Sequence, residues 1–187
     1  MEARVETRDR SPSLIETARE QPIVTAAMAV AALGAATILG AWFFQYVLRY
    51  QPCPMCLEER FPYYFAIPLA VMVVAGAQVG ASRKVLLLAL FAIAVAMLWN
   101  AGFAAFHAGI EWKLWEGPTD CTGSYAGVGS GGLLKELQSI HVPRCDEAAW
   151  TFLGISLAGY DALISLTMTA IAGWGLWARW KLQRGAD

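Results

Sequence analysis

Charged residues are scarce in this sequence. Asp, Glu, Lys and Arg make up only 16% of its 187 residues, whereas 57% are hydrophobic, a composition too apolar for the surface of a soluble protein. The fourteen Lys and Arg are dispersed along the chain and form no basic patch of the kind that binds nucleic acid. We therefore expect the lipid bilayer, and no nucleic acid, to be a partner of this chain.

Residues that bind metals are also few. The sequence has four cysteines and two histidines, and Cys53-Pro54-Met55-Cys56 is its single C-x-x-C motif. A structural zinc site needs four ligands at recognisable spacing, and the two histidines are isolated, so no metal is expected. A C-x-x-C pair can instead close an internal disulfide that is readily reduced, which indicates redox chemistry.

Four apolar stretches are long enough to cross a bilayer, which takes roughly 20 helical residues. The sequence therefore predicts an all-α membrane protein, a bundle of four transmembrane helices at 23–47, 61–79, 85–107 and 159–178. Only Ser82-Arg83-Lys84 separates the second stretch from the third, which predicts a tight helical hairpin. The first stretch is longer than the core of a signal peptide, so we expect it to remain in the mature protein. Residues 1–22 are polar and predict a disordered tail.

The distribution of positive charge predicts the orientation. An even number of spans puts both tails, 1–22 and 179–187, on one side together with the 80–84 turn, and this side holds nine Lys or Arg against five in the other two loops. The positive-inside rule makes that side cytoplasmic. The loops at 49–60 and 111–149, which contain all four cysteines, then face the periplasm of a bacterial inner membrane, a compartment that permits disulfides.

The two cysteine pairs allow different interpretations. Pro54 presets a helical φ angle, so we expect a helical turn to begin there and to stabilise the Cys56 thiolate at its positive end. Cys121 and Cys145 could staple their loop or exchange with other thiols. Glycines and then a leucine pattern at helical spacing lie between them, which predicts a short amphipathic helix at the membrane surface. Such a loop could bring Cys145 over Cys53.

Several acidic residues lie near the predicted spans. Glu58 and Glu59 follow the C-x-x-C motif and could relay protons, although acids at a membrane surface need no special role. Asp161 is expected in the first turn of the fourth helix, where an acid is stabilised by the helix dipole.

Four segments combine distinctive residues with distinctive spacing, namely Trp42–Gln45, Pro52–Arg60, Glu111–Cys121 and Cys145–Gly154. Through them the sequence resembles the DsbB family of disulfide-forming membrane proteins, over residues 23 to about 178. The resemblance implies a protein-disulfide oxidoreductase that reoxidises a periplasmic DsbA-like dithiol protein and passes the electrons to a membrane quinone. It also favours ubiquinone over menaquinone.

The resemblance further implies roles for individual residues. Cys121 and Cys145 would exchange with the donor, with Cys121 forming the mixed disulfide and Cys145 pairing transiently with Cys53. Cys56 would face the quinone. The quinone-binding residues would be Arg60, four residues after Cys56, and His107, at the end of the third span. Pro62 could restart the helix and leave Arg60 on a separate turn.

Three other hypotheses remain open. A relative of the vitamin K epoxide reductases would also combine four helices with a C-x-x-C motif, but in that family the loop cysteines precede the motif, whereas here they follow it. A non-catalytic membrane scaffold would hold two inert disulfides. A conduit that moves electrons outward would place cysteines within its spans, and none of the predicted spans contains one.

Overall fold

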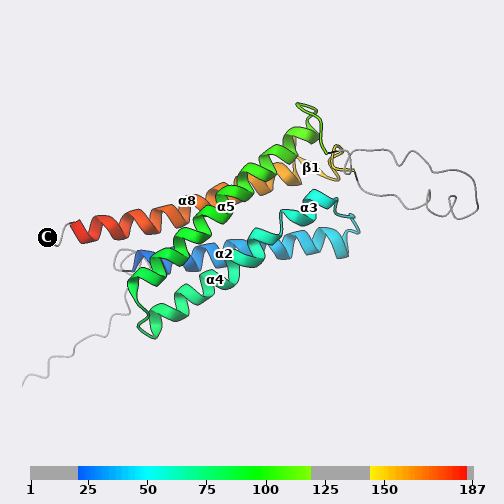
Figure 1. Ribbon diagram of the computed structural model, residues 1–187. Coiled ribbons are helices and arrows are strands. Elements are labelled where there is room, and N and C mark those ends of the chain that lie inside the picture. Colours follow the sequence, from blue (N-terminus) through cyan, green and yellow to red (C-terminus); the bar gives the residue numbers. More distant parts are fainter. Residues whose placement is uncertain (1–20, 119–143, 185–187) are drawn as a thin grey trace, which may run out of the picture.

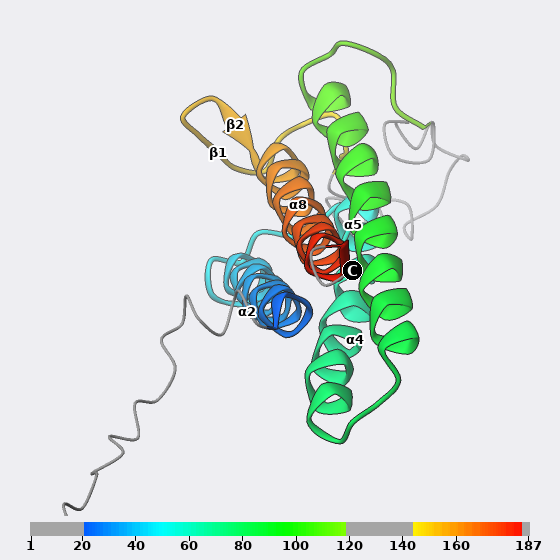
Figure 2. The ribbon, with the colours of Figure 1, turned by 90° about the vertical axis from the view of Figure 1, so that its left-hand side faces the viewer.

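The computed structural model describes residues 21–118 and 144–184, and within them four long helices lie side by side (Figures 1 and 2). They are α2 (Pro22–Trp42), α4 (Phe61–Gln78), α5 (Arg83–Glu111) and α8 (Leu157–Arg184). Helix α2 packs against α4 and α8, and α5 packs against the same two helices, so the four form a closed bundle. This confirms the predicted class, a helical membrane protein.

Three of the described helical segments are long and apolar enough to cross a membrane: Pro22–Val47, Pro54–Gln78 and Arg83–Glu111. Helix α8 has 28 residues and lies along α5 and α2, but it carries Asp161 near one end and several basic residues near the other. Its passage through the bilayer stays a prediction.

Small side chains fill the contacts between the helices. Lipid tails are as apolar as leucine, so membrane helices associate largely through close packing, which alanine and glycine permit. Fully buried alanines come from all four long helices: Ala26, Ala27, Ala66, Ala70, Ala104 and Ala172. Larger residues such as Val30, Leu90, Ile93, Met97 and Met168 complete this core.

Two helices are longer than predicted. Helix α5 continues to Glu111, and its 29 residues span roughly 44 Å at 1.5 Å per residue, more than the roughly 30 Å of a hydrocarbon core. Helix α8 begins at Leu157 and ends at Arg184, so it extends into the predicted C-terminal tail. The tight hairpin is confirmed, because α4 ends at Gln78 and α5 begins at Arg83, with Gly80 in the left-handed region at φ 76°.

Two local features were not predicted. The first helix ends in a π-helical segment, η1 (Phe43–Val47). Before α8, strand β1 (Thr151–Phe152) pairs antiparallel with β2 (Ile155–Ser156), so the chain is not entirely α-helical. Leu153 and Gly154 form the turn between them, both with positive φ, as a two-residue hairpin requires.

One end of the bundle carries the loops of interest. Helix α3 (Pro54–Glu58) lies at the same end as β1, whereas the α4–α5 turn and the end of α8 lie at the other (Figure 1). The amphipathic helix predicted between Cys121 and Cys145 lies outside the described residues, as do most of the predicted tails.

Helix packing at α8 gives a test of the fold. A Cβ atom at Gly175 would lie 2.6 Å from the Ala26 Cβ, whereas a Cβ at Gly173 would meet no atom within 4 Å. We expect Gly175→Ala to destabilise the protein by about 1–3 kcal/mol through overpacking. The matched control Gly173→Ala should be neutral or stabilising by up to about 1 kcal/mol, because alanine favours helix. Unfolding in detergent micelles measures both, and equal effects would contradict the packing.

Candidate redox site

The C-x-x-C motif forms a disulfide at the start of a helical turn. Cys53 and Cys56 are disulfide-bonded, and Cys53 is the N-cap of α3, with Pro54 in the first turn. The Cys56 backbone N–H donates to the Cys53 Sγ at 3.1 Å. This confirms the helical turn predicted from Pro54. Cys53 is only 4% exposed, so its sulfur is enclosed by the protein.

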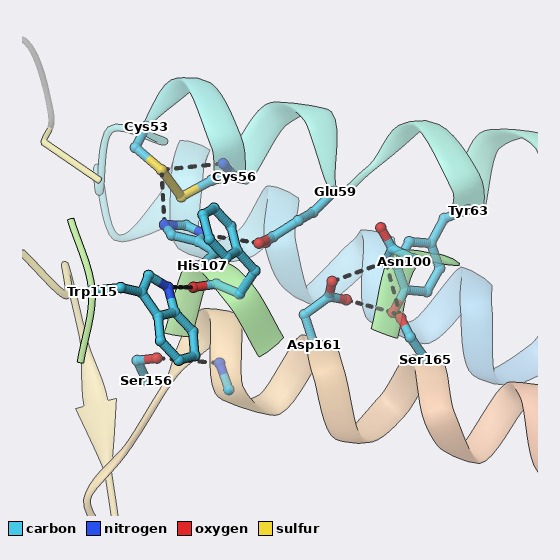
Figure 3. A network of polar contacts seen from close by, with 12 residues as sticks. Cys53, Cys56, Glu59, Tyr63, Asn100, His107, Trp115, Ser156, Asp161 and Ser165 are labelled. Atoms are coloured by element: carbon cyan, nitrogen blue, oxygen red, sulfur yellow. Dashed lines mark hydrogen bonds and ion pairs between the residues drawn. A yellow bond between two sulfur atoms is a disulfide. The ribbon is translucent and has the colours of Figure 1, made fainter. Parts of the chain in front are cut away.

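His107 lies directly against this disulfide. It comes from the last turns of α5, and its side chain is fully buried. Its Nε2 atom is 3.6 Å from the Cys53 Sγ, and its Nδ1 atom is 2.6 Å from the Glu59 Oε1. Glu59 is itself only 7% exposed. Figure 3 shows the resulting row of carboxylate, imidazole and sulfur.

The second loop brings another cysteine to the same place. Cys145 is fully buried and is disulfide-bonded. Its Sγ, the Cys53 Sγ and a His107 ring nitrogen all lie within 4.8 Å of one another. Met55 and Ile110 pack around these sulfurs. Cys121, the other predicted site cysteine, lies outside the described residues.

Ion pairs hold the Cys145 segment against α5. Lys113, just beyond α5, donates to the Asp146 backbone oxygen at 2.6 Å and to its carboxylate at 2.8 Å. Arg144 donates to both carboxylate oxygens of Asp146. Hydrogen bonds from Arg144, and then from Lys113, hold the pKa of Asp146 well below its usual range. Asp146 and its contacts with Lys113 and Arg144, here called the Asp146 tether, therefore keep their charges at any ordinary pH.

A cavity of about 920 Å³ opens beside the disulfide. Cys53, Cys56 and Glu59 lie on its wall, but most of the lining is apolar, from residues such as Leu33, Ile38, Phe44, Trp150 and Ile164. This volume and this character are typical of a site for a small organic molecule. The aromatic rings of Phe44 and Trp150 lie 5.1 Å apart at its edge, and the unpredicted hairpin contributes Phe152.

Arg60 also lines the cavity. It is the N-cap of α4, between the end of α3 at Glu58 and the restart of the helix at Phe61. The break expected from Pro62 is thus present. The Arg60 guanidinium donates to the Gln45 Oε1 at 2.6 Å, so η1 orients it. Its role toward a quinone stays a prediction.

His107 is not among the residues that line the cavity, whereas Glu59 is. Contact between His107 and a quinone stays a prediction, but the geometry favours a role at the sulfurs. Glu59 was assigned no role from sequence. Glu59 contacts His107, which is 48 positions away in the sequence. The positions of the acidic residues along the chain do not indicate this contact.

The expectation for Asp161 was wrong in one respect. Because α8 begins at Leu157, its first turn contains no acidic residue, and Asp161 follows that turn. Its carboxylate is held by side chains of other helices and not by the helix end. It accepts hydrogen bonds from Tyr63 at 2.5 Å and Asn100 at 3.0 Å.

A disulfide at the end of a membrane-helix bundle, with a second disulfide-bonded cysteine against it, is typical of an integral-membrane thiol oxidoreductase. Comparison with known proteins agrees: the model of the family described as disulfide bond formation protein DsbB matches residues 24–175, most of the chain. The chain belongs to the DsbB family. This match favours the hypothesis of a DsbB-like protein over that of a relative of the vitamin K epoxide reductases.

Individual relatives support the same assignment. A disulfide bond formation protein B from Albidiferax ferrireducens is 31% identical over 128 residues, covering 65% of this chain and 69% of the relative. Its counterpart from Polaromonas naphthalenivorans is 29% identical over 157 residues, covering 78% and 89%. No solved structure matches the chain.

The Glu59–His107 pair gives a test of the site. In a variant whose only cysteine is Cys53, we expect Glu59→Gln to raise the midpoint of thiolate formation by about one pH unit, equivalent to about 1.4 kcal/mol. The carboxylate favours the imidazolium, which in turn stabilises the thiolate. Ultraviolet absorbance of the thiolate measures the midpoint. Glu58→Gln, an exposed neighbour, is the control; equal midpoints for the two variants would contradict the arrangement.

Proposed function

We propose that this protein reoxidises a periplasmic DsbA-like dithiol protein and passes the electrons to a membrane quinone, thereby sustaining disulfide formation. One observation carries the proposal: the Cys145 and Cys53 sulfurs lie within 4.8 Å of each other, and Cys56, the disulfide partner of Cys53, lines a largely apolar cavity. The arrangement supports a path for electrons from the loop to the membrane.

The first exchange uses the loop cysteines. A thiolate of the donor attacks Cys121 of a Cys121–Cys145 disulfide, and the Cys145 thiolate leaves. That thiolate attacks the Cys53 Sγ, so a Cys53–Cys145 bond forms, the Cys53–Cys56 bond breaks and the Cys56 thiolate leaves. The second thiolate of the donor then attacks the donor sulfur of the mixed disulfide, so the donor leaves with its own disulfide and Cys121 is released as a thiolate. The Cys121 thiolate attacks Cys145, which re-forms the loop disulfide, breaks the Cys53–Cys145 bond and returns Cys53 as a thiolate.

His107 assists at the Cys53 sulfur, which is first attacked by Cys145 and later leaves as a thiolate. Its Nε2 is 3.6 Å from the Cys53 Sγ, so an imidazolium there stabilises the thiolate that leaves and can hold its proton. The Glu59 carboxylate at the Nδ1 atom compensates the charge of the buried imidazolium, since an unpaired buried charge is costly. This charge balance explains why two ionisable groups are buried together.

The residues around the cavity fit a quinone. An apolar wall suits a quinone ring and its isoprenoid tail, and the Arg60 guanidinium and Gln45 side chain offer donors to a ring oxygen. A bound quinone supplies an acceptor for two electrons and two protons. Cys56 lies on the wall of this cavity, so its thiolate is the group through which the protein gives up the electron pair.

The direction of transfer depends on topology. We propose that both termini are cytoplasmic and that the end of the bundle carrying α3 and the hairpin faces the periplasm, as the distribution of Lys and Arg predicts. The loop cysteines then meet a soluble donor, while the cavity is reached from the membrane.

The most direct test is quinone reduction by the purified protein with a reduced periplasmic dithiol protein as donor. We expect Cys56→Ser to lose at least 99% of turnover, because without Cys56 the Cys53–Cys56 disulfide, which has to accept the electron pair, cannot form. Met55→Leu, in the same turn and of similar volume, is the control and should retain activity. Full turnover by Cys56→Ser would refute the proposal, and cysteines inert to donor and quinone would favour a scaffold.

Arg60 separates the two half-reactions. We expect Arg60→Ala to raise the KM for quinone about tenfold, the size of one charge-assisted hydrogen bond, and to leave donor exchange within about twofold. Single-turnover assays of each half-reaction measure this difference. Arg49→Ala removes another cation from the cavity lining and should change neither. Equal effects of Arg60→Ala on both half-reactions would indicate a membrane anchor.

A further inference from the structure

A second polar cluster faces the same cavity, deeper in the bundle. Its members come from three helices: Tyr63 from α4, Asn100 from α5, and Asp161 and Ser165 from α8 (Figure 3). Tyr63, Asn100 and Ser165 are at most 1% exposed. Asp161 and Tyr63 line the cavity. The redox steps described above use none of these four side chains.

The hydrogen bonds of this cluster all lead to the Asp161 carboxylate. Tyr63 donates to its Oδ1 at 2.5 Å, and Asn100 donates to its Oδ2 at 3.0 Å. The second amide hydrogen of Asn100 goes to the Ser165 Oγ at 2.9 Å. Ser165 can then donate to the Tyr63 oxygen, 3.0 Å away. Every donor hydrogen is used, and the carboxylate is the final acceptor.

Both oxygens of the Asp161 carboxylate already accept a hydrogen bond within the cluster. A proton added to Asp161 would therefore have no acceptor among these hydrogen bonds. Asp161 also lines the cavity, so a molecule bound there can accept a proton from the carboxyl group. Acidic residues at membrane depth are costly and commonly functional. Since Asp161 follows the first turn of α8, stabilisation by the helix end does not account for it.

The cluster lies at a useful distance from the disulfide. Asn100 precedes His107 by seven residues of α5, roughly 10 Å along the helix, and Tyr63 follows Glu59 by one helical turn. A para-quinone has its two oxygens on opposite edges of the ring. Cys56, Arg60 and Asp161 all line the one cavity, so a quinone bound there with one oxygen near Cys56 and Arg60 has its other oxygen available to Asp161.

We propose that Asp161 is a further catalytic residue, which hydrogen-bonds the ring oxygen remote from Cys56 and donates a proton to it. The inference rests on the proposed quinone reduction. In the overall step, the Cys53 and Cys56 thiols lose two electrons and two protons as their disulfide forms, and a quinol gains the same. Asp161 delivers one of these protons and recovers one from those that the thiols release. Tyr63 and Asn100 position the carboxyl group.

Replacement of Asp161 by Asn tests proton donation. An amide keeps the size and the hydrogen-bonding capacity of the carboxyl group but has no acidic proton. General acid catalysis typically contributes about 10²–10⁴-fold, so Asp161→Asn should lower kcat for decyl-ubiquinone reduction at least tenfold. The KM should change less than threefold. Glu116→Gln is the charge-matched control, since Glu116 is exposed and is not among the residues that line the cavity. It should leave kcat within about twofold.

A second measurement does not depend on turnover. A hydrophobic carbodiimide reacts with protonated carboxyl groups within membranes, and the site of labelling is mapped by mass spectrometry. In the wild-type protein we expect label on Asp161, and at least fivefold less when decyl-ubiquinone is bound. Tyr63→Phe keeps the carboxyl group but removes one donor, and labelling of this variant should increase.

The outcomes separate the two proposals. A wild-type protein that exchanges with the donor but never reduces the quinone would refute the proposed function. A wild-type protein that reduces it, with an unchanged kcat in Asp161→Asn, would refute the inference alone. If Asp161→Asn does not fold, the labelling decides: labelling of Asp161 without protection by quinone would overturn the proposal.

Discussion

The contact between Glu59 and His107 is the interaction on which this site depends. One partner follows the C-x-x-C turn and the other lies near the end of α5, so the 2.6 Å contact joins the segment between α3 and α4 to α5 beside the disulfide. Both side chains are buried, and the contact gives each polar group the partner without which its burial would be costly. As a consequence, the imidazole is directed at the Cys53 sulfur, and Cys145 can pack on the same group.

The amino-acid sequence was sufficient for the helices and for parts of the site. Apolar length predicted four helices, Ser82 to Lys84 predicted the hairpin turn, and Pro54 predicted the helical turn that begins there, directly after Cys53. The contacts between helices could not be predicted in this way. These helices are apolar on nearly all sides, so no polar face indicates which side turns inward. Partners such as Asp161 and Asn100, 61 positions apart, therefore become visible only in the fold.

Short local signals were also missed. Leu153-Gly154 between two β-prone dipeptides is a two-residue turn of the type that closes a hairpin, but strands of only two residues are too short for an alternating pattern in the sequence. The π-helical end of the first span orients Gln45 toward Arg60, and a π-helix has no simple sequence signature. Both segments border the cavity, so the local irregularities of the fold lie where a ligand would bind.

The arrangement separates thiol exchange from chemistry in the membrane. Sulfurs, imidazole and carboxylate form one centre near the end of the bundle, and the cavity extends from it to the Asp161 cluster deeper among the helices. Both cysteines of the disulfide line the cavity, and the Cys53 sulfur also contacts His107 and lies beside Cys145, so the disulfide is placed between the second loop and the cavity. The Asp146 tether holds the second loop at the junction.

The central claim is that Cys145 reacts with Cys53. The most direct measurement is disulfide trapping in a variant that keeps only these two cysteines, with Cys56 and Cys121 replaced by serine. Under mild oxidation, mass spectrometry should find one Cys53–Cys145 disulfide in nearly every molecule, because the sulfurs lie within 4.8 Å. Two free thiols that both accept an alkylating reagent would contradict the account.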